Sequence, residues 1–302
     1  MTDTQDSRTE TAPKPRHRGT AASWVLGIGA LASLGAVLMS LYSLTGMSDG
    51  LDDTGAMLLA LSLFSPIIIA MFAGAVGGTV AGRLPGPRVP LTAAGFTAVG
   101  LAAAGAAYAL FSVDAPIALA LGLIMLGSAL IGGLFSLPRH RAPVIAGLLA
   151  TLLLLGLMVL RGLAESSSAS LFSDPLDEYG ALGTIAPFLA GLACGLCAFA
   201  VLRKAAAPKR LYSYLFAGAI PGAIWLLSTI IAQVGVEVIL SLGVDQVSSL
   251  DSAYLTLTFQ WQYNGAMTVL FAGALCSVLA YGLLLPKAER TSSSSEGAYQ
   301  SR

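Results

Sequence analysis

Three cysteines are the residues of this chain whose type and spacing first suggest chemistry. Cys194 and Cys197 form a Cys-Gly-Leu-Cys pattern, and Cys276 lies in a separate apolar stretch. In a soluble protein C-x-x-C is typical of redox or metal-binding sites. No histidine or acid accompanies these thiols to complete a zinc site, and cysteine packs well as a small apolar side chain. We therefore expect packing, with no metal and no cofactor; the alternative is that the three thiols meet.

Groups for acid–base or nucleophilic catalysis are scarce. The two histidines, His17 and His140, both lie in basic segments. The chain contains no H-E-x-x-H, G-x-S-x-G or P-loop pattern. The hydroxyl groups of the apolar stretches have no neighbouring base to activate them. We therefore expect no catalytic residues and no enzymatic activity.

A polar and aromatic segment precedes the last apolar stretch. From Leu255 to Tyr263 apolar and polar residues alternate, which is typical of a short extended segment. Trp261 and Tyr263 also suit an aromatic belt at a membrane surface. The alternatives are anchoring in this belt and recognition of a lipid head group, a glycan or a partner protein. The candidate recognition residues are Gln233, Glu237, Gln260, Trp261, Gln262 and Tyr263.

The composition shows what kind of protein must position these residues. Apolar residues make up 56% of the 302-residue chain and charged residues 11%, and the mean hydropathy is +0.79. A soluble domain carries roughly 25% charged residues. The chain is therefore expected to be a membrane protein, and a nucleic-acid-binding or secreted soluble function is excluded.

Eight apolar stretches are long enough to cross a hydrocarbon layer, which takes about 20 residues in a helix. Continuous runs of this length favour helices over the strands of a β-barrel. The fold class predicted is all-α, a polytopic membrane bundle of eight transmembrane helices. The expected spans are Ala21–Thr45, Gly55–Gly82, Pro90–Ser112, Ala115–Leu137, Pro143–Leu163, Ala181–Leu202, Leu211–Leu240 and Asn264–Pro286.

Charge is distributed unequally between the two sides that these spans define. The side of the N-terminus receives 15 basic and 5 acidic residues, and the other side receives 1 basic residue, Arg161, and 11 acidic residues. Because basic residues mark cytoplasmic loops, both termini are predicted to be cytoplasmic. The acidic Glu237 falls near the outer end of its span. It is either a helix end emerging into water or part of a polar site at the mouth of the bundle.

The two ends of the chain differ from the apolar middle. Residues 1–20 and 287–302 are polar, and we expect disordered cytoplasmic tails on either side of a transmembrane domain over 21–286. The first apolar run is longer than the 7–15 residues of a signal-peptide core, which favours an uncleaved helix. Many alanines, glycines and arginines hint at a bacterial genome, and hence at a bacterial plasma membrane.

Small residues and prolines are the main signals inside the spans. Glycines four residues apart let helices approach closely, either within the bundle or against a partner or second copy. We favour packing within the bundle. Prolines inside spans predict kinks, which in transporters line cavities. The packing candidates are Gly74, Gly78, Gly82, Gly191 and Gly195, and the kink candidates are Pro66, Pro187 and Pro221.

Two functions fit these features. The first is a non-enzymatic subunit or accessory of an envelope or transport assembly, which fits the small-residue faces and the lack of catalytic groups. The alternative is a permease-like carrier of an apolar or uncharged small substrate. No charged residue lies near the centre of any expected span, which disfavours an ion-coupled carrier. The expected partners are the lipid bilayer and a membrane protein or a second copy, and not nucleic acid.

Overall fold

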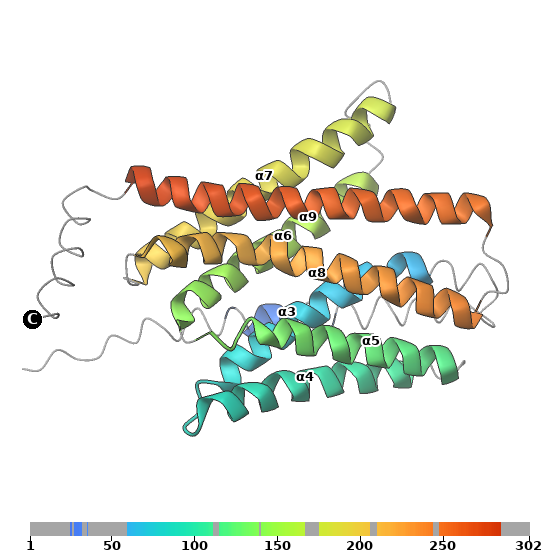
Figure 1. Ribbon diagram of the computed structural model, residues 1–302, viewed down its shortest axis with the longest axis horizontal. Coiled ribbons are helices and arrows are strands. Elements are labelled where there is room, and N and C mark those ends of the chain that lie inside the picture. The colour runs from blue at the N-terminus through green and yellow to red at the C-terminus, as the bar shows by residue number, and fades with distance from the viewer. Residues whose placement is uncertain are drawn as a thin grey trace, which may run out of the picture.

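The computed structural model describes residues 59–110, 115–138, 140–166, 175–205, 210–243 and 248–284, together with 25, 27–31 and 35. All regular structure in these residues is helical, as predicted (Figure 1). Seven helices in the described residues are long and apolar enough to cross a membrane. Of the expected span Ala21–Thr45 only seven residues are described, so this span, and with it the count of eight, is not confirmed. The predicted tails lie outside the described residues.

Long helices pack side by side in a bundle (Figure 1). Five of the seven predicted spans that are described begin within about two helical turns of their predicted starts. The helices are α3 (Phe64–Ala81), α4 (Arg88–Leu110), α5 (Ala115–Leu134), α6 (Arg141–Ser166), α7 (Pro175–Lys204), α8 (Leu211–Gly243) and α9 (Ser249–Leu284).

Consecutive helices run in opposite directions, so alternate helices begin at the same end of the bundle (Figure 1). The two ends carry different charged residues. We call the end where α4, α6 and α8 begin the basic end, because Arg88, Arg141 and Arg210 lie there. The opposite end, where α5, α7 and α9 begin, is called the acidic end. Among the described side chains it carries Glu237 and Asp251 as well as Arg161.

The helices pack as two trios with α6 beside the second. In the first trio α3, α4 and α5 all contact one another, and in the second α9 contacts both α7 and α8. The trios are joined through α8, which contacts both α3 and α5, and α6 packs on α7 and α8. Helix α8 therefore makes most of the contacts between the two halves of the bundle, and α6 adds contacts with α3.

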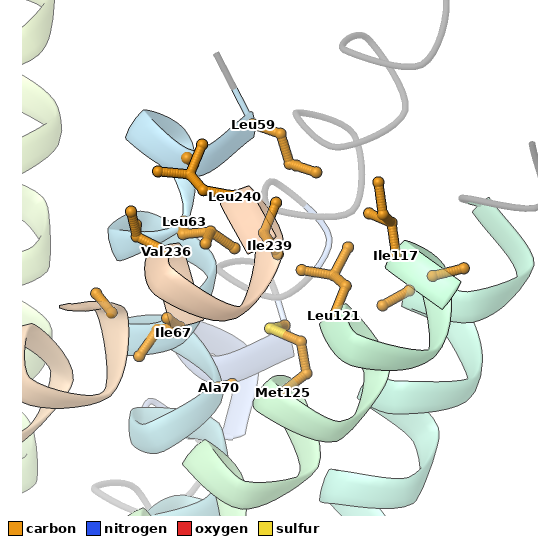
Figure 2. Close-up of a cluster of buried hydrophobic side chains, with 14 of the residues drawn as sticks. Leu59, Leu63, Ile67, Ala70, Ile117, Leu121, Met125, Val236, Ile239 and Leu240 are labelled. Carbon is orange, nitrogen blue, oxygen red and sulfur yellow. The ribbon is translucent and has the colours of Figure 1, made fainter. Parts of the chain in front are cut away.

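A cluster of buried side chains fixes α8 against the first trio near the acidic end (Figure 2). Leu63, which precedes α3, and Ile67 of α3 meet Leu121 of α5 and Ile239 of α8. All four side chains are fully buried. Burying a side chain of this size contributes about 1.5–3 kcal/mol. This end of α8 is thus packed firmly against α3 and α5.

The last predicted span is wrong at its start. The structure continues α9 as one helix from Ser249 to Leu284, whereas the sequence analysis placed a loop up to Tyr263. The segment predicted to be extended, Leu255 to Tyr263, is helical throughout. Its apolar residues at every second position lie on different sides of the helix, so that Leu255 is buried and Leu257 is 52% exposed.

Helices α8 and α9 are longer than a membrane-spanning helix needs to be. Their 33 and 36 residues correspond to about 50 and 54 Å at 1.5 Å per residue, more than the ~30 Å of a hydrocarbon layer. When their ends at the basic end lie at one membrane surface, the last turns of α8 and the first turns of α9 extend past the other. These two helices contact each other closely, so they extend together.

Candidate functional site

The start of α9 shows why the chain folds as a helix where hydropathy is low. The Ser248 hydroxyl accepts a hydrogen bond from the backbone N–H of Asp251 (3.1 Å) and donates one to its carboxylate (2.7 Å). A serine followed three residues later by an acid is an N-terminal cap of an α-helix. The acid also lies in the first turn, where the helix dipole favours negative charge. This cap pattern was present in the sequence and was missed.

A groove of about 540 Å³ lies between α8 and α9 toward the acidic end. Its base is apolar, and Val236, Leu240 and Leu255 belong to the same buried cluster that holds α8 against α3 and α5. The groove therefore has a rigid floor and a polar rim. The polar and aromatic lining residues are Gln233, Glu237, Ser252, Thr256, Phe259, Gln260, Tyr263 and Asn264.

Four of the six predicted recognition residues meet in this groove. They are Gln233 and Glu237 of α8 and Gln260 and Tyr263 of α9. The phenol hydroxyl of Tyr263 donates a hydrogen bond to the amide oxygen of Gln233 (3.0 Å), which links the two helices. The Glu237 side chain is exposed. The rim thus offers one negative charge together with amide and hydroxyl groups.

Trp261 and Gln262 do not line this groove. The Trp261 side chain is 58% exposed on another face of α9, where an aromatic belt residue is expected. Gln262 lines a smaller hollow with Phe64 and Thr258. Its side-chain oxygen is buried and has no hydrogen-bond partner among the described residues. The structure therefore divides the predicted set in two.

Ser252 and Thr256 also line the groove and were missed as candidates. The signal was available once α9 is taken as a helix, because Ser252, Thr256, Gln260 and Asn264 recur every four residues on one face. The extended interpretation concealed this face, since it separated residues that a helix brings together.

Asn264 also borders a second groove of about 520 Å³ between α7 and α9. Its lining is mostly apolar, and Phe271 and Leu275 are 62% and 61% exposed. Both grooves follow one slowly turning face of α9, with Asn264 at their junction. A ligand or partner segment that is polar at one end and apolar along its length would match this order. The other lining residues are Phe188, Met267, Thr268 and Ala272.

The glycines predicted to form packing faces lie against neighbouring helices of the same chain. A Cβ at Gly74 would collide with the Ala129 carbonyl of α5, and one at Gly78 with the Ser136 side chain. A Cβ at Gly82 would lie 2.5 Å from the Thr92 hydroxyl of α4. These contacts account for the spacing on α3 without a second copy of the chain.

The second trio has an equivalent crossing centred on Gly273 of α9. A Cβ at Gly195 of α7 would meet Gly273 of α9. A Cβ at Gly191, one turn earlier in α7, would meet Val269 and Ala272 of α9. On the α8 side a Cβ at Gly273 would lie 2.5 Å from the Gly218 carbonyl. The Gly218-x3-Gly222 spacing of α8 was another signal that the sequence analysis did not use.

The three prolines occupy different positions. Pro66 lies in the first turn of α3, after a turn at Leu63 interrupts the helix. A proline clashes with the carbonyl four residues earlier, which accounts for an interruption there. Pro187 and Pro221 lie inside α7 and α8, and both helices continue through them. A Cβ at Gly265 would lie 3.2 Å from the Trp225 ring and 3.6 Å from the Pro187 ring.

Two of the three cysteines hydrogen-bond to the backbone of a neighbouring helix. Cys194 donates to the Ala150 carbonyl of α6 (3.3 Å), and Cys276 donates to the Leu192 carbonyl of α7 (3.5 Å). All three thiols are free. Within the described residues no group of three or more histidines, cysteines or acids is placed to hold a metal ion.

The fold and the groove define a class of protein, an apolar helical bundle of the kind that is embedded in membranes, with seven described helices able to span one. The comparisons with known proteins do not narrow this class: no family model matches the chain, and neither a curated protein nor a solved structure is significantly similar to it.

Proposed function

We propose that this protein is a non-enzymatic subunit or accessory of a membrane assembly, in the plasma membrane of a bacterium and with both termini cytoplasmic. The groove between α8 and α9 is its surface for recognising a partner protein. The observation that carries this proposal is the groove itself, with a rigid apolar floor and four predicted recognition residues on its rim.

The position of the groove supports a partner at the membrane surface. Gln233 lies about 33 Å along α8 from Leu211, and Asn264 about 30 Å along α9 from Leu284, at 1.5 Å per residue. Both distances match the ~30 Å thickness of the hydrocarbon layer. The groove therefore begins at the membrane surface and continues outward toward Ser252.

The charges at this end indicate the chemistry of the partner. The sequence assigns 11 acidic residues and 1 basic residue to this side, and Glu237 lines the groove. A partner segment with a lysine or arginine beside an apolar side chain would pair its charge with Glu237 and bury its apolar group against Val236 and Leu240. Complementary charge of this kind favours association and fixes its orientation.

A role without catalysis is supported by the hydroxyl groups inside the spans. Thr151, Ser228 and Thr229 each donate to the carbonyl four residues earlier in their own helix. These bonds satisfy the three hydroxyls within their own helices, whereas the buried hydroxyl of Ser277 has no hydrogen-bond partner in the described structure. None of the three is hydrogen-bonded to a histidine or carboxylate in the described structure, and such a base is a common activator of a hydroxyl nucleophile.

The experiment compares two lysine substitutions of equal charge change. Gln260→Lys places a cation in the groove, and Ser241→Lys places one on the exposed surface of the same end, outside the groove. The full-length chain and both variants are expressed at native level, purified in a gentle detergent and examined by mass spectrometry. We expect a stoichiometric partner with the unmodified chain and with Ser241→Lys, and at least about a tenfold loss with Gln260→Lys.

A photo-crosslinking amino acid at position 260 should attach to that same partner, at a segment that contains a lysine or arginine. Purification of the chain alone, as a monomer or homodimer, would contradict the proposal. Equal recovery of the partner with both lysine variants would also contradict the groove as its binding surface.

The second candidate function is a permease-like carrier of an uncharged or apolar small molecule. It is favoured by the open groove, whose depth is lined by the uncharged groups of Gln233 and Asn264. Toward the basic end the path is closed, because the backbone of α8 at Gly222 packs against Leu270 of α9. A carrier would have to separate this contact. Uptake of uncharged solutes into vesicles that contain only this protein would favour the carrier.

A further inference from the structure

Three arginines surround a small polar hollow at the basic end of the bundle. Arg83 follows α3, Arg88 begins α4 and Arg141 begins α6. The hollow has a volume of about 10 Å³, close to the space of one water-sized oxygen atom. Its other lining residues are Gly78, Thr79, Gly82, Thr92, Ser136 and Ile145.

Two of these arginines hold the neighbouring loops in a reciprocal arrangement. Arg88 donates to the Pro138 carbonyl in the connection before α6, and Arg141 donates to the Gly82 carbonyl before α4, each at 2.6 Å. Each arginine thus binds the segment that leads into the other's helix. These two hydrogen bonds hold both guanidinium groups beside the hollow.

The arrangement concentrates positive charge. Burial lowers the pKa of the Arg83 guanidinium below its ordinary value, and the positive charge of Arg141 lowers it further. Arg88 and Arg141 also stand at the first residues of α4 and α6. The amino end of a helix carries partial positive charge, so cations there are unfavourable and an anion is favoured.

The sequence supplies no acid to these segments. It holds no aspartate or glutamate between Asp53 and Asp114, and none between Asp114 and Glu165. The three arginines lie within those two stretches, and Asp114 belongs to the opposite end. Two helix starts and three guanidinium groups therefore converge there, beside the carboxyl-terminal turn of α3.

We propose that Arg83, Arg88 and Arg141 form a binding site for a phosphate group, with one anionic oxygen in the hollow and the others at its mouth. A guanidinium presents a planar fork of N–H donors that matches phosphate oxygens, in pairs. Of the five donors of Arg141, the described structure uses one in a hydrogen bond, to Gly82. The site lies where α3 ends and where α4 and α6 begin. Once these apolar helices span a membrane, that level corresponds to its phosphate layer.

The phosphate has two sources, the head group of an anionic lipid and phosphate free in solution. The full-length chain in neutral detergent is examined by native mass spectrometry with phosphatidylglycerol, with phosphatidylcholine and with inorganic phosphate. Binding of phosphatidylglycerol well above phosphatidylcholine identifies the lipid source, and binding of inorganic phosphate without lipid identifies the free source. Binding of neither phosphatidylglycerol nor inorganic phosphate overturns the proposal.

The matched variants are Arg83→Gln in the site and Arg203→Gln outside it. Arg203 is exposed in the last turn of α7, at the same end of the bundle, and does not line the hollow. We expect Arg83→Gln to weaken binding by at least about tenfold and Arg203→Gln to leave it unchanged. Equal weakening by both variants would mean attraction to a diffuse charge, and would overturn the site.

A second variant keeps the test valid if the loss of a guanidinium also disturbs the loops. Arg141→Lys retains the positive charge and removes the planar fork. We expect it to fold, as judged by an unchanged elution volume, and to bind more weakly than the unmodified chain. Binding as strong as that of the unmodified chain would show that charge alone acts there, and would contradict recognition by a guanidinium fork.

Discussion

The hydroxyl of Tyr263 on α9 lies 3.0 Å from the side-chain oxygen of Gln233 on α8 and donates a hydrogen bond to it. The two residues are 30 positions apart in the sequence, and both line the groove between the helices. The bond therefore joins the two walls of the groove.

The first prediction concerns the energy of this bond. Tyr263→Phe and Gln233→Leu each remove one partner, and the double variant removes both. Interhelical hydrogen bonds in membrane proteins contribute about 0.6 kcal/mol on average, so we expect a coupling free energy of about that size from the double-mutant cycle. Reversible unfolding in mixed micelles measures it. Strictly additive single effects would mean that the two side chains do not interact.

The second prediction concerns the start of α9. Ser248→Ala removes the hydroxyl that caps Asp251, and loss of such a cap costs about 1 kcal/mol. We expect faster hydrogen exchange at Asp251, by about fivefold, since 1.4 kcal/mol corresponds to tenfold. Ser249→Ala is the control, because its hydroxyl makes no hydrogen bond in the described structure. Equal acceleration by both changes would argue against the cap.

The contrast between α8 and α9 shows which parts of the fold the sequence can predict. The start of α8 at Leu211 was predicted correctly because Arg210 marks an abrupt change from charged to apolar residues. No such change marks Ser249. The first turns of α9 are rich in Ser, Thr and Gln, and their alternation with leucines imitates a strand. Only contacts with α8 and the cap at Ser248 settle that this segment is helical.

The residues that line the groove between α8 and α9 could be related to one another only in part from the sequence, because neighbours on one helix are predictable and neighbours on different helices are not. Gln233 and Glu237 are one helical turn apart, so their common face followed from the sequence alone. That Gln260 and Tyr263 lie opposite them depends on the register of α9 against α8. This register is set by contacts such as that of Gly273 with Gly218, which hydropathy does not reveal. The reciprocal bonds of Arg88 and Arg141 are likewise products of tertiary packing.

The third prediction tests the crossing at Gly273. A Cβ there would lie 2.5 Å from the Gly218 carbonyl oxygen, so α8 and α9 must separate to admit it. Overpacking of this kind costs about 1–3 kcal/mol and occasionally more. We expect Gly273→Ala to lower the unfolding temperature in detergent by several degrees. The control is Gly156→Ala on α6, where a Cβ meets nothing within 4 Å. An unfolding temperature as high as that of the control would contradict this close contact.

The fourth prediction concerns the side of the membrane on which each end lies. Because the predicted eight-span topology assigns 15 of the 16 basic residues to the side of the basic end, we expect this end to face the cytoplasm. Tyr212 and Leu250 are both 79% exposed and lie in the first turns of α8 and α9, at opposite ends of the bundle. Each is replaced by cysteine in a chain whose native thiols are changed to alanine. A maleimide that cannot cross membranes should then label Leu250→Cys in intact cells and leave Tyr212→Cys unlabelled. Permeabilised cells, in which both positions must react, provide the control. Labelling of Tyr212→Cys alone in intact cells would invert the topology, and would move the groove between α8 and α9 to the cytoplasmic surface.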